Sequence, residues 1–172
     1  MSNLASIQMY TDGSCQSNPG GAGGWGAIII YPDGSIERYA GHETSTTSNR
    51  MEVMAAIGGL EKTKVNSEIE IFSDSRYLVN SMSRGWKKRK NTDLWDILDA
   101  IAKQRIITWT WIKGHNGLFY NEAADKLAKA ASHDKHEEYI KLCVNDPVWG
   151  TDRVPVYLGP PEMWEYINLD YT

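Results

Sequence analysis

Cysteine is scarce in this sequence, and long apolar runs are missing from it. Cys15 and Cys143 are the only cysteines among 172 residues, too few for a disulfide framework or a zinc cluster. No stretch reaches the roughly 18 consecutive apolar residues that a membrane-spanning helix needs. The segment from Met1 to Ser6 lacks the charged region and the apolar stretch of a signal peptide. We therefore expect a reduced, cytoplasmic protein without a membrane anchor, and one that acts as a monomer.

The net charge of −4 argues against a nucleic-acid partner only until the charge is divided along the chain. Residues 134–172 contain eight acidic and three basic residues, whereas the residues before them contain 14 acidic and 15 basic residues. If bound metal neutralises four of those 14 acids, the remaining surface of the first part is net positive. Nucleic-acid binding follows local patches of charge rather than the charge of the whole chain. The composition therefore leaves nucleic acid open as a partner.

The spacing of apolar residues predicts an α/β domain. Short runs in which apolar and polar residues alternate are typical of strands, and apolar residues three to four apart are typical of helices. The predicted strands are residues 7–12, 25–31, 35–41, 68–73 and 106–112, and the predicted helices are residues 48–61, 75–83, 94–103 and 121–132. This order indicates a layered fold with a mixed sheet.

Two details of the first predicted helix can be read from its residues. Ser48 or Asn49 is a plausible N-cap, because side-chain oxygens of this kind accept hydrogen bonds from the first backbone N–H groups. Gly58 and Gly59 lie inside the helix, where each costs about 1 kcal/mol relative to alanine. We therefore expect another part of the chain to pack closely against these two glycines.

Four acidic residues come from four different segments, and most of their neighbours are small or apolar. Asp12 ends the first predicted strand, Asp74 follows the fourth, and Glu52 and Asp125 lie in the early turns of two helices. Carboxylates that a fold brings together repel one another unless a cation neutralises them. Such oxygen ligands favour Mg²⁺ or Mn²⁺ over zinc. The pattern predicts a metal-dependent active site.

Each acid considered alone also has a simpler interpretation. Glu52 and Asp125 could interact with the dipoles of their helices, and Asp74 could cap the helix that follows it. This alternative does not explain why four separate segments supply acids beside small or apolar residues.

The glycine-rich segment from Gly21 to Gly26 matches the pattern GxGxxG of dinucleotide-binding loops. That pattern works where the loop opens a helix whose N-terminus holds the pyrophosphate. Here the following residues, up to Ile30, continue as an apolar strand. We therefore reject a dinucleotide cofactor.

Residues 84–90, which we call the basic segment, place five positive charges around Trp86. The simpler interpretation is a solvated loop. The alternative is an edge that grips phosphates and packs an aromatic ring against a sugar or base. His115 stands in a second loop, between glycines at 114 and 117. Such a loop is exposed and mobile, so the histidine is suited to proton transfer near carboxylates.

Several short motifs in this order resemble those of type 1 ribonuclease H. They are Thr11-Asp12-Gly13-Ser14-Cys15, Asn18-Pro19-Gly20, Asn49-Arg50-Met51-Glu52, Ser73-Asp74-Ser75, Lys113-Gly114-His115, and Asn121-Glu122 with Asp125. The resemblance covers about residues 5–132. It implies the ribonuclease H-like fold, a five-stranded mixed sheet flanked by helices, with a catalytic domain in residues 1–133.

The resemblance implies an endonuclease that cleaves the RNA strand of RNA–DNA hybrids and leaves 5′-phosphate and 3′-hydroxyl ends. Its cofactor would be two Mg²⁺ ions, with Mn²⁺ as the alternative, in a two-metal mechanism. Asp12, Glu52, Asp74 and Asp125 would hold the metal, and His115 would assist proton movement or product release.

The resemblance also implies residues that contact the hybrid. These are Asn18, Thr47 and Asn49, together with Trp86, Lys87 and Lys88 of the basic segment. The basic segment is a much shortened form of the long basic helix and loop of familiar bacterial members. Hybrid binding would then be weaker or would depend on this short run.

Residues 134–172 lie outside the resemblance and form an acidic extension that contains prolines and aromatic residues. The aromatic content is too high for a plain disordered linker, and we expect the extension to pack on its own domain. The rival interpretation is a docking site for a protein partner.

Two other functions compete with ribonuclease H. A DNA-cutting nuclease on the same scaffold is disfavoured by the Gly114-His115 loop and by the Asn49-Arg50-Met51-Glu52 helix. A binding module that has lost catalysis is disfavoured by the complete set of four carboxylates.

Overall fold

The order of strands and helices in the domain agrees with the order that the sequence predicts. The computed structural model of the chain describes residues 6–133, 155–156 and 167–168. The elements are β1 (Ile7–Cys15), β2 (Gly23–Ile30), β3 (Ile36–Glu43), α1 (Ser48–Leu60), β4 (Glu68–Ser73), α2 (Arg76–Ser83), α3 (Thr92–Ala102), β5 (Ile106–Trp111), α4 (Phe119–Ser132), β6 (Pro155–Val156) and β7 (Ile167–Asn168).

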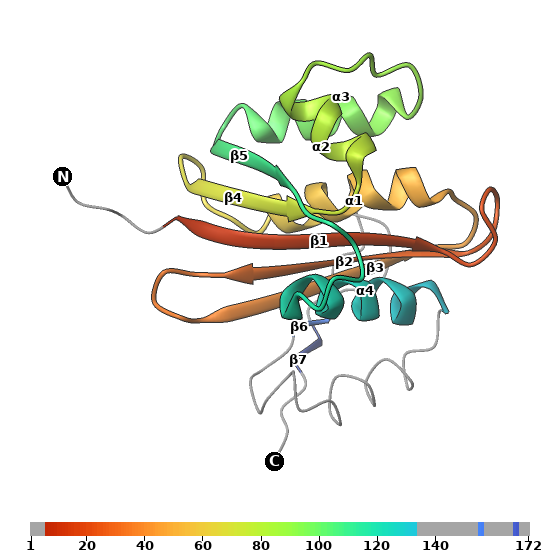
Figure 1. Cartoon of the computed structure of the whole chain (residues 1–172), viewed down its shortest axis with the longest axis horizontal. Helices are drawn as coiled ribbons and strands as arrows, with labels where there is room; N and C mark the ends of the chain where they lie inside the picture. Colours follow the sequence, from red (N-terminus) through yellow and green to blue (C-terminus); the bar gives the residue numbers. More distant parts are fainter. Residues whose placement is uncertain (1–5, 134–154, 157–166, 169–172) are drawn as a thin grey trace.

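The first five strands form one mixed sheet with the order β3-β2-β1-β4-β5. β1, β2 and β3 are antiparallel neighbours, and β4 and β5 continue the sheet parallel to β1. β1 is therefore the central strand (Figure 1). The predicted five-stranded mixed sheet is confirmed.

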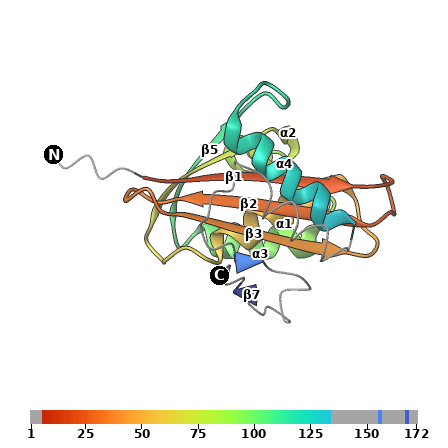
Figure 2. The ribbon, with the colours of Figure 1, turned by 90° about the horizontal axis from the view of Figure 1, so that it is seen from below.

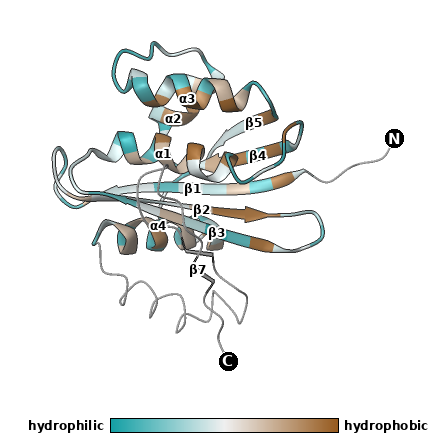
Figure 3. Ribbon diagram, turned by 180° about the vertical axis from the view of Figure 1, so that it is seen from behind, coloured by the Kyte–Doolittle hydropathy of each residue, from teal (hydrophilic) through white to brown (hydrophobic). Residues whose placement is uncertain are grey.

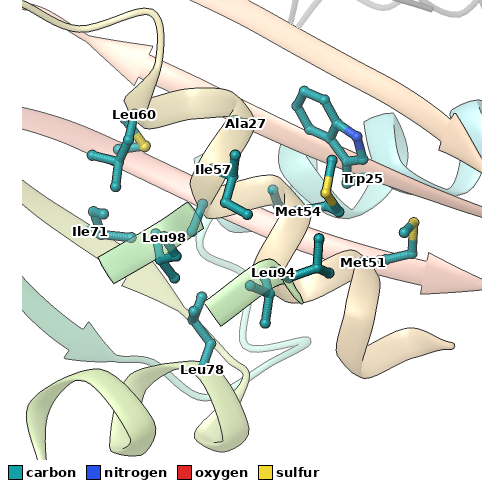
Figure 4. Packing of buried hydrophobic residues seen from close by; sticks show 14 of the residues in the cluster. Trp25, Ala27, Met51, Met54, Ile57, Leu60, Ile71, Leu78, Leu94 and Leu98 are labelled. Carbon is teal, nitrogen blue, oxygen red and sulfur yellow. The ribbon is translucent and has the colours of Figure 1, made fainter. Parts of the chain in front are cut away.

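Helix α1 lies between the sheet and a second layer that α2 and α3 form (Figure 1). Every residue from Met51 to Leu60 is buried. This burial follows from the sequence, because the helix is apolar around most of its circumference and needs cover on several sides. Figure 4 shows Met54 and Ile57 of α1 among side chains from the sheet and from α3, including Trp25 and Leu94.

Helix α4 covers the opposite face of the sheet and crosses β1, β2 and β3 (Figure 2). Its turns mix hydrophilic and hydrophobic residues (Figure 3), as expected of a helix with one face on a sheet. The close approach of α4 to β2 depends on glycines at the contact. A Cβ on Gly26 would lie 2.6 Å from the Cβ of Leu127, and one on Gly24 would meet the α4 backbone.

This packing accounts for Gly26, the last glycine of the GxGxxG match. Gly26 lies inside β2, so the run continues as a strand and opens no helix, as predicted. Gly24 and Gly26 let α4 approach the sheet.

The predicted close contact at Gly58 and Gly59 is confirmed. A Cβ on Gly58 would meet the indole ring of Trp25, and one on Gly59 would lie 2.6 Å from the sulfur of Met9. The two glycines therefore let α1 approach β1 and β2.

Two local predictions were wrong. β1 does not end at Asp12 but continues to Cys15, because residues 12–15 pair with the start of β2 and are not part of a loop. The N-cap of α1 is Thr47, whose hydroxyl accepts a hydrogen bond from the backbone N–H of Arg50 at 3.2 Å. Both errors concern element boundaries, where pairing with a distant strand and the exact start of a helical turn decide the outcome.

In the described part of the chain, no helix has both the length and the apolar character required to cross a membrane. β6 and β7 form a short antiparallel pair, and β6 lies near β3. The predicted packing of the extension otherwise concerns residues outside the described ranges.

Candidate active site

Three of the predicted acids meet where β1, α1 and the end of β4 come together. Asp12 lies inside β1, Glu52 lies in the first turns of α1, and Asp74 directly follows β4. One carboxylate oxygen from each lies within 4.8 Å of one from each of the others. Asp12 and Glu52 are buried, with exposed fractions of 5% and 8%. The fold therefore assembles a compact cluster from segments far apart in sequence.

A glycine brings α1 close enough for this cluster to form. A Cβ on Gly13 would lie 2.5 Å from the backbone nitrogen of Glu52 and 2.6 Å from the carbonyl carbon of Met51. Both are backbone atoms, so they cannot move aside as a side chain could. Only glycine at position 13 lets the start of α1 lie directly on β1, beside Asp12.

Burial and mutual repulsion shift the pKa of all three carboxyl groups. Burial, followed by the charge of Asp74, raises the pKa of Asp12 to about 8. Burial and then the charge of Asp12 raise the pKa of Glu52 well above its ordinary value. The pKa of Asp74 is raised by burial and by the charge of Asp125. Without a cation, the site therefore retains protons at neutral pH.

The donor set of the cluster fits a hard divalent cation. All three residues offer carboxylate oxygens, which Mg²⁺ and Mn²⁺ prefer. Oε2 of Glu52 is buried and has no hydrogen-bond partner among the described residues. An unpaired buried carboxylate oxygen is costly unless a ligand satisfies it. The position of this atom beside two further carboxylates is what a cation-binding site requires.

Asp125 lies at the edge of the cluster. Its charge acts on both Asp12 and Asp74, but it is not one of the three residues that converge within 4.8 Å. Oδ2 of Asp125 accepts a hydrogen bond from Nζ of Lys129, one helical turn later, at 2.7 Å. The motifs of the sequence do not point to Lys129. The only sequence signal was its spacing of four residues from Asp125, which is common on exposed helix faces.

The loop that follows β5 packs against Asp74. A Cβ on Gly114 would lie 2.5 Å from Oδ2 of Asp74. His115 is exposed, with a left-handed backbone at a φ of 53°, and its charge partly offsets the rise that burial and Asp125 cause in the pKa of Asp74. The indole N–H of Trp111 donates to the backbone oxygen of Asp74 at 3.1 Å. The structure thus places His115 at the exposed rim of the carboxylate cluster.

Three of the predicted substrate-contacting residues gather at the N-terminus of α1. Thr47 caps the helix, and Asn49 is exposed in its first turn. Oδ1 of Asn18 accepts a hydrogen bond from the backbone N–H of Ser48 at 3.3 Å. These residues therefore surround the turn that carries Glu52.

The other three predicted substrate-contacting residues, Trp86, Lys87 and Lys88, belong to the basic segment, which lies between α2 and α3. Trp86 is 49% exposed and Lys87 is exposed. Lys88 is only partly exposed: its Nζ donates to Oδ1 of Asp99 at 2.8 Å and lies 5.3 Å from the centre of the Trp95 ring. The three residues predicted to bind substrate thus differ in how available their side chains are.

Comparison with known proteins identifies the family to which the chain belongs. The family model of RNase H matches residues 5–133. The chain is a member of the RNase H family. The curated relatives include Ribonuclease H from Hahella chejuensis (strain KCTC 2396), 43% identical over 138 residues, which are 73% of this chain and 92% of that protein. Ribonuclease HI from Synechocystis sp. (strain ATCC 27184 / PCC 6803 / Kazusa) is 40% identical over 140 residues, covering 73% of this chain and 87% of that protein.

Solved structures of RNase H domains share the fold. The N-terminal RNase H domain of a Mycobacterium tuberculosis protein has a TM-score of 0.65 and 28% identity, covering 74% of this chain and 94% of that chain. LC11-RNase H1, solved in complex with an RNA/DNA hybrid, has a TM-score of 0.63 and 26% identity, covering 74% of this chain and 97% of that chain. The resemblance to type 1 ribonuclease H is therefore confirmed.

Proposed function

We propose that the chain is a magnesium-dependent endonuclease that hydrolyses the RNA strand of RNA–DNA hybrids and leaves 5′-phosphate and 3′-hydroxyl ends. The observation that carries the proposal is the convergence of Asp12, Glu52 and Asp74 within 4.8 Å, with one buried Glu52 oxygen lacking a partner. Membership of the RNase H family, and a related structure solved with an RNA/DNA hybrid, support the substrate.

In this proposal, Asp12, Glu52 and Asp74 hold the divalent cations, and Asp125 completes the site from α4. Mg²⁺ ions held by these carboxylates would supply activation of a water molecule and stabilisation of the charge on the departing oxygen of a phosphodiester. The protein contributes a rigid set of ligands, because Asp12 lies in the central strand and Glu52 in a fully packed helix. Rigid ligands hold the reacting groups in a productive geometry.

His115 exchanges protons at the rim of the site. It is exposed and close enough to Asp74 for the charges of the two residues to interact. An imidazole nitrogen can accept a proton or donate one, so this side chain can take up a proton from the water or deliver one to the departing 3′ oxygen.

A cleavage assay tests the proposal directly. Labelled RNA–DNA hybrid, duplex RNA and duplex DNA are incubated separately with Mg²⁺, with Mn²⁺ and with EDTA. We expect cleavage of the RNA strand in the hybrid alone, and none in EDTA. Phosphatase treatment of the labelled products then reports whether the new 5′ ends carry phosphate.

Two variants separate chemistry from folding. Asp12→Asn keeps the size of the side chain but removes a metal-binding charge, and we expect it to abolish cleavage while hybrid binding persists. Asp96→Asn removes an exposed acid from α3 and serves as the matched control. Intact hybrid RNA after incubation with a folded wild-type protein that binds it would reject the enzyme, and preferential cleavage of duplex DNA would favour the DNA-nuclease alternative.

A further inference from the structure

The basic segment is held at its middle by a salt bridge. Nζ of Lys88 donates to Oδ1 of Asp99 in α3 at 2.8 Å and lies 5.3 Å from the centre of the Trp95 ring. The Lys88 side chain is 26% exposed. Its charge is therefore already paired with an acid and oriented by an aromatic ring, so Lys88 is poorly placed to neutralise a phosphate as well.

The C-terminal end of the segment is held by a hydrogen-bonded hub around Tyr77. The Tyr77 hydroxyl accepts hydrogen bonds from Nδ2 of Asn91 at 3.0 Å and from Nε1 of Trp95 at 3.2 Å. It also donates to the backbone oxygen of Lys90 at 3.4 Å. Asn91 has a left-handed backbone with a φ of 58° and directly precedes α3. These bonds fix the direction in which the segment enters α3.

Arg50 connects this hub to the carboxylate cluster. Its guanidinium donates to both carboxylate oxygens of Asp93 at 3.0 Å, and to Oδ1 of Asn91 at 3.3 Å. A bidentate guanidinium–carboxylate pair fixes orientation as well as distance. Arg50 lies in the first turn of α1, two residues before Glu52. One side chain therefore joins the turn that bears a catalytic carboxylate to the end of the basic segment.

Lys87 differs from Lys88 although the two are adjacent. Lys87 is exposed, and none of the salt bridges found among residues 6–133 includes it. Trp86 beside it is 49% exposed. A free cation next to an exposed aromatic ring is suited to contact with a nucleic-acid backbone. The segment thus contains an anchored part and a part free to bind.

We propose that Arg50 and Lys88 are positioning residues that hold the basic segment at a fixed place relative to the carboxylates, and that Lys87 makes the phosphate contact. This inference rests on the proposed function, because it assigns roles in gripping the hybrid that the site cleaves. Preorganisation matters here because the segment is short. A basic segment held in a fixed position loses less conformational freedom on binding than a mobile loop would.

Salt dependence distinguishes a positioning residue from a phosphate contact. The slope of log affinity against log salt is negative, and removing a phosphate contact reduces its magnitude by about one. Removing a positioning residue weakens binding but leaves the number of neutralised phosphates, and therefore the slope, unchanged. Hybrid binding is measured by fluorescence anisotropy in the Asp12→Asn background, over a series of salt concentrations, so that cleavage is not needed for the readout.

The decisive comparison is between Lys87→Gln, Lys88→Gln and Asp99→Asn. We expect Lys87→Gln to weaken binding about tenfold and to reduce the magnitude of the slope by about one. Lys88→Gln and Asp99→Asn should each weaken binding about threefold and leave the slope unchanged, because each breaks the same weak, partly exposed pair. Lys103→Gln removes an exposed charge at the end of α3 and should change neither quantity.

The connection through Arg50 is tested by a double-mutant cycle. Arg50→Lys keeps the charge but loses the bidentate pair, and Asp93→Asn removes the partner. We expect each change to raise KM several-fold with little effect on kcat, and the double variant to be no worse than either single one. Thermal unfolding of each variant identifies any loss of folded protein at the assay temperature.

Three results would overturn the inference. They are a slope reduced in magnitude by Lys88→Gln, unchanged binding in Asp99→Asn, and additive effects of the Arg50 and Asp93 changes. Failure of the proposed function would look different, because the wild-type protein would then leave hybrid RNA uncut. A wild type that cleaves hybrids, with anchor variants that bind normally, rejects the positioning role alone.

Discussion

Gly13 of β1 lies directly against the backbone of Glu52 in α1: a Cβ at position 13 would lie 2.5 Å from the Glu52 nitrogen. Strand and helix touch here through backbone atoms, so neither can give way. The contact fixes how close the Glu52 carboxylate comes to Asp12, the adjacent residue in β1. The spacing of the cluster thus depends on the absence of a side chain as much as on the acids.

We predict that Gly13→Ala displaces the start of α1 and lowers kcat for hybrid cleavage about 100-fold, since a shift of about 1 Å in an active site costs that much. The added methyl would meet Met51 and Glu52 backbone atoms. The measurements are steady-state cleavage rates and Mg²⁺ affinity by calorimetric titration, which should fall as well. A Gly13→Ala variant with wild-type kcat would show that α1 can shift without loss of activity, and would contradict the prediction.

The sequence predicts the order of strands and helices well, because period-two and period-3.6 patterns are local signals. Of the four predicted acids, the structure brings Asp12, Glu52 and Asp74 together. The sequence also predicts a close contact at Gly58. It does not predict that Gly13 fits against α1, because that depends on how two elements meet in space. For the same reason, it does not reveal that Lys129 pairs with Asp125, or that Lys88 pairs with Asp99. Adjacent lysines look equivalent in a sequence, and only packing distinguishes them.

Gly58→Ala should destabilise the protein although alanine is the better helix former. The gain in helix propensity is about 1 kcal/mol. Against it, the new methyl would meet the ring of Trp25, which is buried with 1% exposed, and overpacking a core costs about 1–3 kcal/mol. We expect a net loss of about 1 kcal/mol in the free energy of unfolding, measured by urea denaturation. Adding Trp25→Phe should recover part of the loss caused by Gly58→Ala if the ring is its cause.

The metal-free protein should lose stability as pH rises from about 4 to 8. The pKa of Asp12 is about 8 in the folded protein, against 3.8 ordinarily, because of burial and the charge of Asp74. A carboxyl group whose pKa is raised on folding holds its proton in the folded state after the unfolded chain has released it. Its contribution to stability is therefore full below about pH 4 and is lost as pH passes through about 8. Glu52 acts in the same direction.

Melting temperatures measured in EDTA across this range test the pH prediction, with Asp12→Asn as the comparison. The difference in melting temperature between variant and wild type should grow in favour of the variant as pH rises. Saturating Mg²⁺ should raise the melting temperature of the wild type most strongly at the alkaline end of the range, where the carboxylates are ionised. Identical pH profiles of the two proteins in EDTA would contradict the assigned origin of the shift.

Lys129→Gln should strengthen metal binding. Nζ of Lys129 donates to Asp125 at 2.7 Å, and its charge also interacts with Asp12. A fixed positive charge beside the cluster opposes a divalent cation, and it holds one Asp125 oxygen that could otherwise face the metal. The side chain of Lys129 is 56% exposed, so solvent screens much of this effect. We expect Mg²⁺ affinity to rise about threefold in a calorimetric titration, and the gain to shrink as salt is added.

Lys103→Gln is the matched charge control, because Lys103 is exposed at the end of α3. Weaker Mg²⁺ binding in Lys129→Gln would instead mean that the lysine orients Asp125 toward the site.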